Sequence, residues 1–252
     1  MISYRMVTCA LLAVLMTPGA TALMAQNAGT AITDEQARTR VEELQGVLNE
    51  GQENMRLWWW GWTGIYTALS AGSFTIAALA DGDTEKITYT VSGVQSALGV
   101  IGMLISPQAA GYGPSRIRNM PAGTPAELRA KLTESERILD QAAEDEIMGR
   151  SWITHALALV VNGGGALVIW KKYGDRIEDD GGDPGKEAIL NFVLGTIVSE
   201  IQIFTQPTRA MADRDAYRRR HGLPAAGDAG GEVRFFAAPS QRGMMMGATL
   251  FL

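Results

Sequence analysis

The chain has 252 residues, of which 46% are apolar and 19% are charged, so it is long enough for a substantial core and somewhat poorer in charge than an average soluble protein. Its net charge of −5 leaves no domain-wide basic surface, which argues against nucleic acid as a partner. The sequence contains no phosphate-loop, zinc-protease, serine-hydrolase or paired-cysteine motif.

The first 25 residues have the pattern of an export signal. Arg5 supplies a positive charge, residues 6–16 form an apolar segment, and small residues lead to Ala25, after which we expect cleavage. The alternative is an uncleaved first membrane helix, although the apolar segment is short for a span. The only cysteine, Cys9, lies in this segment, so the mature chain would have no thiol for disulfides, catalysis or metal binding.

Residues 26–106 are predicted to form an amphipathic helix followed by a membrane hairpin. Thr33 has the position of an N-cap, because acidic residues follow it directly. Apolar or small residues then recur at steps of four and three, the spacing of a seam that packs on another helix: Ala37, Val41, Leu44, Leu48, Gly51, Met55, Trp58 and Trp62. No strong breaker follows, so we predict one helix from about Thr33 to about Ala80.

Four stretches are long enough for a bilayer span, which takes roughly 20 mostly apolar residues. They are residues 57–80, 87–105, 151–170 and 188–206, and polar turns join them in two pairs. Tryptophans gather at their ends, as at a membrane–water boundary. The sequence therefore predicts an all-α membrane protein with four transmembrane helices in two hairpins. The alternative is a soluble, glycine-rich helical bundle.

Small residues recur every four positions in the first stretch, at Gly64, Ala68 and Gly72, and this spacing would let another helix approach closely. The second stretch has the same spacing at Gly93 and Ala97. Both patterns favour helices that pack within a membrane.

Residues 107–123 are rich in glycine and proline and are predicted to be a loop. Thr124, Pro125 and Glu127 then supply an N-cap, a proline at the first helical position and a capping-box glutamate. Residues 124–207 are therefore predicted to form a second flanking amphipathic helix and a second membrane hairpin.

The two halves of the chain have the same order of elements. Each places an Arg-x-Trp sequence before its hairpin, beginning at Arg56 and at Arg150, and each hairpin ends just before a proline. This order favours an internal duplication, with a chance match as the alternative.

Residues 208–252 are predicted to form a short basic helix, a linker and a small C-terminal β-hairpin. The helix ends in three arginines and a glycine stop, and two apolar runs flank a turn at residues 239–242. The arginines are candidates for binding anionic lipid headgroups, or alternatively they complement the negative end of the helix dipole: Arg218, Arg219 and Arg220.

The orientation in the membrane involves a conflict. Cleaved export would place the larger polar segments on the periplasmic side of a bacterial-type cell envelope. Those segments carry most of the lysine and arginine, whereas the positive-inside rule assigns such segments to the cytoplasm. Long translocated segments weigh less in that rule, so we expect the periplasmic orientation.

Four polar residues within the apolar stretches are the candidate site: His155, Glu200, Asn162 and Asn191. An antiparallel hairpin brings His155, near the start of the third stretch, to the depth of Glu200, near the end of the fourth. Ionisable side chains in a membrane are costly and indicate function by default, although both could serve packing alone. Asn162 begins a glycine run that either loosens the helix or seats a close crossing, and Asn191 could bond across to it.

These features predict a structural or interaction protein of the cell envelope, integral to the membrane, with no catalytic chemistry, cofactor or metal site evident. Its partners would be membrane lipid and either a second copy of the chain or another envelope protein. One alternative is a small transporter or channel component that uses the polar residues between the third and fourth helices. Another alternative is a soluble periplasmic helical binding module.

Overall fold

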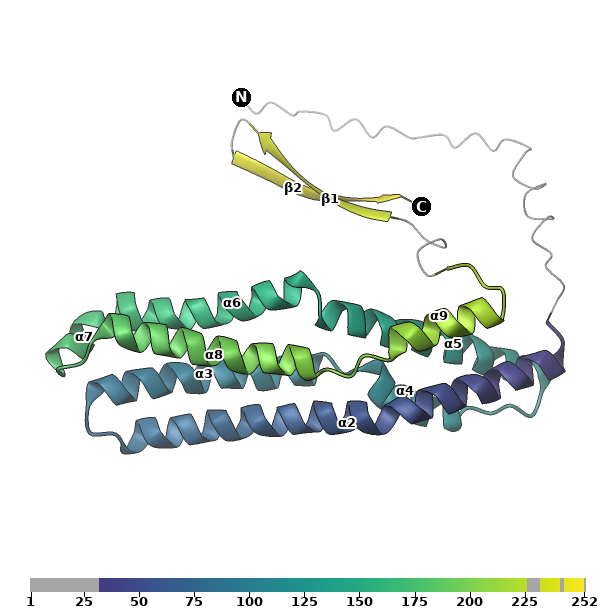
Figure 1. Ribbon diagram of the computed structural model, residues 1–252, viewed down its shortest axis with the longest axis horizontal. Helices are drawn as coiled ribbons and strands as arrows, with labels where there is room; N and C mark the ends of the chain where they lie inside the picture. Colours follow the sequence, from purple (N-terminus) through teal and green to yellow (C-terminus); the bar gives the residue numbers. More distant parts are fainter. Residues whose placement is uncertain (1–31, 226–231, 241–242, 252) are drawn as a thin grey trace, which may run out of the picture.

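The computed structural model describes residues 32–225, 232–240 and 243–251 (Figure 1). The predicted export signal, residues 1–25, lies outside these residues. The helical part is elongated, with two helix hairpins side by side at one end and shorter helices packed around the start of the longest helix at the other.

Helix α2 (Asp34–Leu79) is continuous over 46 residues, which confirms the predicted long helix. Thr33 caps it, because its hydroxyl accepts a hydrogen bond from the Gln36 N–H while the Gln36 side chain accepts one from the Thr33 N–H. At 1.5 Å per residue the helix is about 69 Å long. Its two halves therefore lie in different surroundings.

The first half of α2 packs against α4 (Ala109–Arg118) and α5 (Pro125–Gly149), and α9 (Ala210–Arg220) packs against α5; we call this unit the head. Both predicted amphipathic faces are buried in it. Its core gathers apolar side chains from all four helices: Ala37, Val41, Leu44, Leu48, Ile117, Leu128, Leu132, Ile138, Leu139 and Tyr217.

The second half of α2 forms a hairpin with α3 (Asp83–Ile105), and α6 (Trp152–Leu167) forms another with α8 (Pro184–Thr205). We call these four helical segments the bundle. Helices pack along each other within each hairpin, but the two hairpins touch at few places. The glycine run in α6 does not break that helix. The spacing of Gly64 and Gly72 seats no neighbour, because both positions face open space, whereas a Cβ at Gly93 would meet the Phe74 ring.

The far end of the bundle, opposite the head, contains two elements that the sequence did not predict. The helix of α6 continues as a π-helical turn, η1 (Val168–Lys172), and a short helix, α7 (Gly174–Asp179), occupies the predicted turn before α8. A small apolar cluster holds α3, η1, α7 and α8 together at this end: Ile87, Ile169, Ile177 and Ala188.

Three helical stretches in the described residues are long and apolar enough to cross a membrane: Asp83–Arg118, Trp152–Lys172 and Pro184–Arg220. Their apolar parts are α3, α6 with η1, and α8. The stretch 57–80 of α2 is not among them, so three of the four predicted spans are supported. That stretch is uncharged, but it is rich in tryptophan, tyrosine, glycine and hydroxyl residues, which are only weakly apolar and lower its mean hydropathy.

The predicted loop at residues 107–123 was wrong, since most of it is helix α4. The Asp145 carboxylate accepts a hydrogen bond from the Ala109 N–H at 2.7 Å and so caps the first turn. A Cβ at Gly113 would collide with Ile138 of α5, which shows how closely the two helices approach. Burial against α5 thus overrides the poor helix propensity of the glycines and of Pro114.

The C-terminal segment begins with the predicted helix stop. Gly222 has a φ of 61°, and the Leu223 N–H donates to the Arg218 carbonyl at 2.9 Å. Farther on, β1 (Glu232–Ser240) and β2 (Gly243–Phe251) pair as antiparallel strands. The turn between them, 241–242, lies outside the described residues, so the predicted hairpin stays a prediction.

Candidate functional site

A cleft of about 1010 Å³ lies between the two hairpins and extends along the bundle. At the head end its lining includes Gln108 and Asp145, and at the far end it includes Thr84, Glu85 and Glu187. These residues come from α3, α5 and α8 and from the segment before α4. The cleft therefore reaches from one end of the bundle to the other.

The polar side chains that line the cleft form one stripe on α3 and one on α8. Most of them are separated by three, four or eight residues, which places them on one side of each helix. On α3 they are Thr84, Glu85, Thr88, Ser92, Gln95 and Ser96; on α8 and at its C-cap they are Glu187, Asn191, Ser199, Gln202 and Gln206. Of these, only Asn191 was predicted from the sequence. Hydroxyl and amide residues at helical spacing within apolar stretches are the signal that would have revealed the rest.

Gln95 is central to the polar contacts between the hairpins. Its Nε2 donates to the carbonyls of Val161 and Asn162 at 3.3 and 3.4 Å, and its Oε1 accepts from Asn191 Nδ2 at 3.0 Å. Asn191 Nδ2 also donates to Ser92 Oγ at 3.0 Å. Hydrogen bonds of this kind join helices where apolar packing between them is sparse.

Three buried oxygen atoms in the far half of the cleft have no hydrogen-bond partner among the described residues: Thr84 Oγ1, Thr88 Oγ1 and Asn191 Oδ1. The Asn191 side chain is deeply buried, with an exposed fraction of 7%. An unsatisfied buried polar group costs roughly 1–3 kcal/mol. Oxygens of this kind can form hydrogen bonds to buried water or coordinate a hard cation.

Every charged side chain that lines the cleft is an acid: Glu85, Asp145 and Glu187. Burial raises the pKa of Asp145; the bond from the Ala109 N–H opposes this effect, and the neighbouring Glu144 adds to it. The polar turns at the far end, 81–86 and 171–187, carry nine acidic and five basic side chains, a net charge of −4. The charges of the cleft and of its far mouth therefore favour cations over anions.

His155 and Glu200, the predicted pair, do lie together. His155 Nδ1 is 3.0 Å from Glu200 Oε1 and 2.9 Å from Oε2. Their side chains are 31% and 29% exposed, and neither residue lines the cleft. The Phe204 ring lies beside His155, and Arg150 donates to the Phe204 carbonyl rather than to Glu200. The pair thus lies apart from the polar stripes and joins α6 to α8.

Asn162 and Asn191 both line the cleft but do not bond to each other. Asn162 Nδ2 donates to the Ala158 carbonyl at 2.8 Å and to Ser199 Oγ at 3.2 Å, so it joins α6 to α8. A Cβ at Gly195 would collide with the Asn162 amide, which confirms a close helix crossing there. Asn191 instead connects α8 to α3, as described above.

The tryptophans at the head end have two different roles. Three indole N–H groups donate to neighbouring helices: Trp58 to Gln202 and Trp62 to Thr205 in α8 of the other hairpin, and Trp59 to Met103 in α3 of the same hairpin. Another, Trp60, is exposed on the outer surface, as are Trp152 at this level and Trp170 at the far end. The tryptophans at the head end therefore connect the two hairpins through hydrogen bonds, and they also mark the level at which the bundle meets the head.

Two of the three arginines at the end of α9 have partners within the head. Arg218 Nη2 contacts both Asp140 oxygens at 3.0 and 2.9 Å, and Arg220 pairs with Glu43. Burial alone would raise the pKa of Glu43, but hydrogen bonds from His221 and Arg220 outweigh this effect and lower that pKa. A role of these arginines in lipid binding stays a prediction.

Comparison with known proteins gives no family assignment. No protein-family model matches the chain, and neither a curated protein nor a solved structure does. Within the part of the chain that the structure describes, no group of three or more histidine, cysteine or acidic residues could hold a metal ion. Function is therefore argued from the geometry of the cleft.

Proposed function

We propose that the protein is a small channel or transporter component, integral to the membrane of a bacterial-type cell envelope, that passes a small cation between its two hairpins. The observation that carries this proposal is the polar cleft, whose charged lining residues are all acids at its two ends. Three helices of sufficient length and apolar character support the membrane location.

The second half of α2 is proposed as the fourth helix of the membrane bundle. It packs along α3, and its side chains away from the cleft include Ile65, Ile76 and Leu79, each more than a third exposed. Apolar side chains on the open face of a helix are stable against lipid, whereas water would disfavour them. The head is proposed to lie on the periplasmic side, as the predicted export signal implies.

The lining suggests how a cation would pass. Glu85 and Glu187 would attract it at the far mouth, where two fixed negative charges raise the local cation concentration. The oxygens of Thr88 and Asn191 would then replace part of its hydration shell. Asp145 would receive it at the head end.

Reconstitution into liposomes tests this proposal. We expect purified protein to conduct Na⁺ or K⁺ well above protein-free liposomes, with a reversal potential that shows cation selectivity. Glu187→Gln removes one of the two carboxylates at the far mouth, so it should lower both the conductance and the selectivity for cations. Glu178→Gln is the matched control, because Glu178 lies at the same end of the bundle but not on the lining.

Two results would contradict the proposal. Correctly folded protein that conducts no cation would exclude a passage, and selectivity unchanged by Glu187→Gln would exclude the cleft as its path. Recovery of the native protein in the soluble fraction after an alkaline carbonate wash would contradict membrane integration and favour a periplasmic binding module.

An interaction protein of the envelope is the second candidate, and the head favours it. The head has its own core and ion pairs, yet it contributes few of the residues that line the cleft. Such a unit is suited to contact a second copy or another envelope protein. Site-specific photo-crosslinking from the exposed Tyr112 of α4 in intact cells would capture such a partner, and its absence would leave only the cleft to explain.

A further inference from the structure

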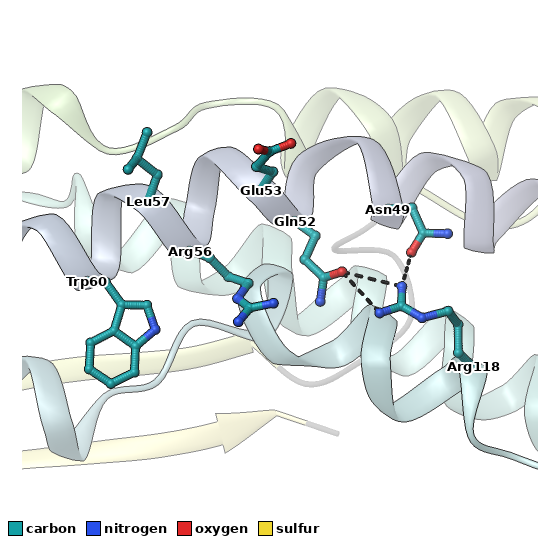
Figure 2. A pocket seen from close by; sticks show the side chains of 7 residues that line it. All are labelled: Asn49, Gln52, Glu53, Arg56, Leu57, Trp60 and Arg118. Carbon is teal, nitrogen blue, oxygen red and sulfur yellow. Dashed lines mark hydrogen bonds between the residues drawn. The ribbon is translucent and has the colours of Figure 1, made fainter.

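A second depression, of about 690 Å³, lies on the outer surface where the head meets the bundle. Residues of α2 and α4 line it, and two of them are arginines, Arg56 and Arg118. Both are exposed, and neither forms an ion pair with any residue in the described part of the chain. The other ionic side chain on its wall, Glu53, points away from both arginines (Figure 2).

Uncharged neighbours hold the Arg118 guanidinium in a fixed orientation. Its Nη1 donates to Asn49 Oδ1 at 2.5 Å and to Gln52 Oε1 at 3.3 Å, and its Nη2 donates to Ser115 Oγ at 2.9 Å. Gln52 is itself fixed, because its Nε2 donates to the Gly111 carbonyl and to Ser115 Oγ, both at 3.0 Å. Amide and hydroxyl partners orient the positive charge without neutralising it.

Arg56 completes the site from the other side. The aliphatic part of its side chain lies next to Gly111 of α4, where a Cβ would be 3.7 Å from Arg56 Cγ. Figure 2 shows the Arg56 and Arg118 guanidinium groups pointing toward one another across the depression. Two planar guanidinium groups with unneutralised charge are well matched to the oxygens of a phosphate.

The position of the site along α2 identifies the source of that phosphate. The uncharged run of α2 begins at Leu57, directly after Arg56, and Leu57 and Trp60 are 73% and 60% exposed. Trp60 lies one helical turn farther into the bundle than Arg56 and hangs from the same side of α2 (Figure 2). Charge followed by exposed tryptophan and leucine matches the order of phosphate and acyl region in a lipid leaflet.

We infer that Arg56 and Arg118 bind the phosphate of an anionic phospholipid, with Trp60 and Leu57 against its glycerol and upper acyl region. The inference rests on the membrane location but not on cation passage. It places lipid recognition at the boundary of head and bundle, away from the arginines at the end of α9.

Native mass spectrometry of the detergent-solubilised protein, titrated with phosphatidylglycerol or with phosphatidylcholine, tests the site. We expect phosphatidylglycerol to bind preferentially. The double variant Arg56→Gln with Arg118→Gln should lose roughly tenfold or more in affinity for it, since each arginine near an anionic lipid contributes about a factor of five. Arg116→Gln is the matched control, because Arg116 lies on the same helix but already pairs with Glu134 at 2.9 Å.

Two further variants and a competition with inorganic phosphate make each outcome decisive. Arg118→Lys keeps the charge but loses the forked geometry, so it should bind with intermediate affinity and show that folding is intact. Equal binding of the two lipids, or an unchanged double variant, would overturn the inference. Displacement of phosphatidylglycerol by millimolar inorganic phosphate would overturn it too, in favour of a site for free phosphate. Glu187→Gln should leave lipid binding unchanged, which separates this site from the proposed passage.

Discussion

The head and the bundle are held together by different forces, although one helix, α2, runs through both. The head has an apolar core in which side chains such as Leu44 and Ile138 are fully buried. Among residues 32–225, all ion pairs lie in the head except His155–Glu200 and Arg176–Asp83. The bundle instead exposes large apolar side chains outward and joins its hairpins through amide and hydroxyl groups.

This difference reflects the solvent for which each region is suited. In water, burying apolar side chains drives helices together, so the head places its leucines and isoleucines inside. In lipid that driving force is absent between helices, and small residues and polar contacts take its place. The polar stripes of the bundle are thus consistent with a membrane location and are also the features that a passage requires.

The largest expected effect comes from removing a core side chain of the head. Ile138→Ala should lower the free energy of unfolding by about 2–5 kcal/mol, because it leaves a cavity at a fully buried position. Ile189→Ala in α8, where the side chain is 64% exposed, should change it by only about 0.5 kcal/mol. Urea titration in mild detergent, followed by circular dichroism, measures both. Equal effects would mean that the two regions do not differ in packing as described.

Alkaline pH should weaken the head through Tyr217. Burial raises the pKa of Tyr217, and its hydrogen bond to Glu136, at 2.5 Å, raises it further. Above pH 10 the unfolded chain loses this proton while the folded chain keeps it, so stability should fall with a slope of up to about 1.4 kcal/mol per pH unit.

The measurement is the free energy of unfolding of the wild type and of Tyr217→Phe between pH 8 and pH 11. Tyr217→Phe should reduce the slope above pH 10. Tyr112→Phe, at the partly exposed tyrosine of α4, should keep it. If the slope persisted in Tyr217→Phe, this tyrosine would not be its source.

A smaller effect is expected for the predicted pair in the bundle. His155→Ala and Glu200→Ala should each destabilise the protein, and the double variant should cost less than their sum, with a coupling of about 0.6–1.7 kcal/mol, as for hydrogen bonds between membrane helices. Thermal unfolding in detergent gives the three values. Additive effects would show that the two side chains act separately despite their 2.9 Å contact.

The smallest effect compares adjacent glycines of α6. Gly164 faces open space, so Gly164→Ala should stabilise the helix by up to about 1 kcal/mol. At Gly165 a Cβ would collide with the Gln95 amide and displace it from the Val161 and Asn162 carbonyls. Gly165→Ala should therefore not stabilise the protein as Gly164→Ala does. Unfolding in detergent distinguishes the two variants. Equal stabilisation would mean that the Gln95 contacts do not hold the hairpins.

Much of the fold followed from local patterns in the sequence. The N-cap at Thr33, the capping box at Thr124, the long helix α2 and the glycine stop at Gly222 were predicted and confirmed, because each depends on a few neighbouring residues. The meeting of His155 and Glu200 followed from counting residues along an antiparallel hairpin. Helix α4 was missed, since its stability comes from packing against α5 rather than from its own residues.

The amino-acid sequence by itself determined the extent of α2, the start of α5 and which of their faces are apolar, because helical periodicity and capping act over a few residues. Only the tertiary structure decided which faces of the two hairpins meet. That pairing brings Gln95 of α3 to Asn191 of α8, and Arg118 of α4 to Asn49 of α2, across separations in the chain that no local pattern records. The cleft, and the depression lined by Arg56 and Arg118, form only because these distant segments pack side by side.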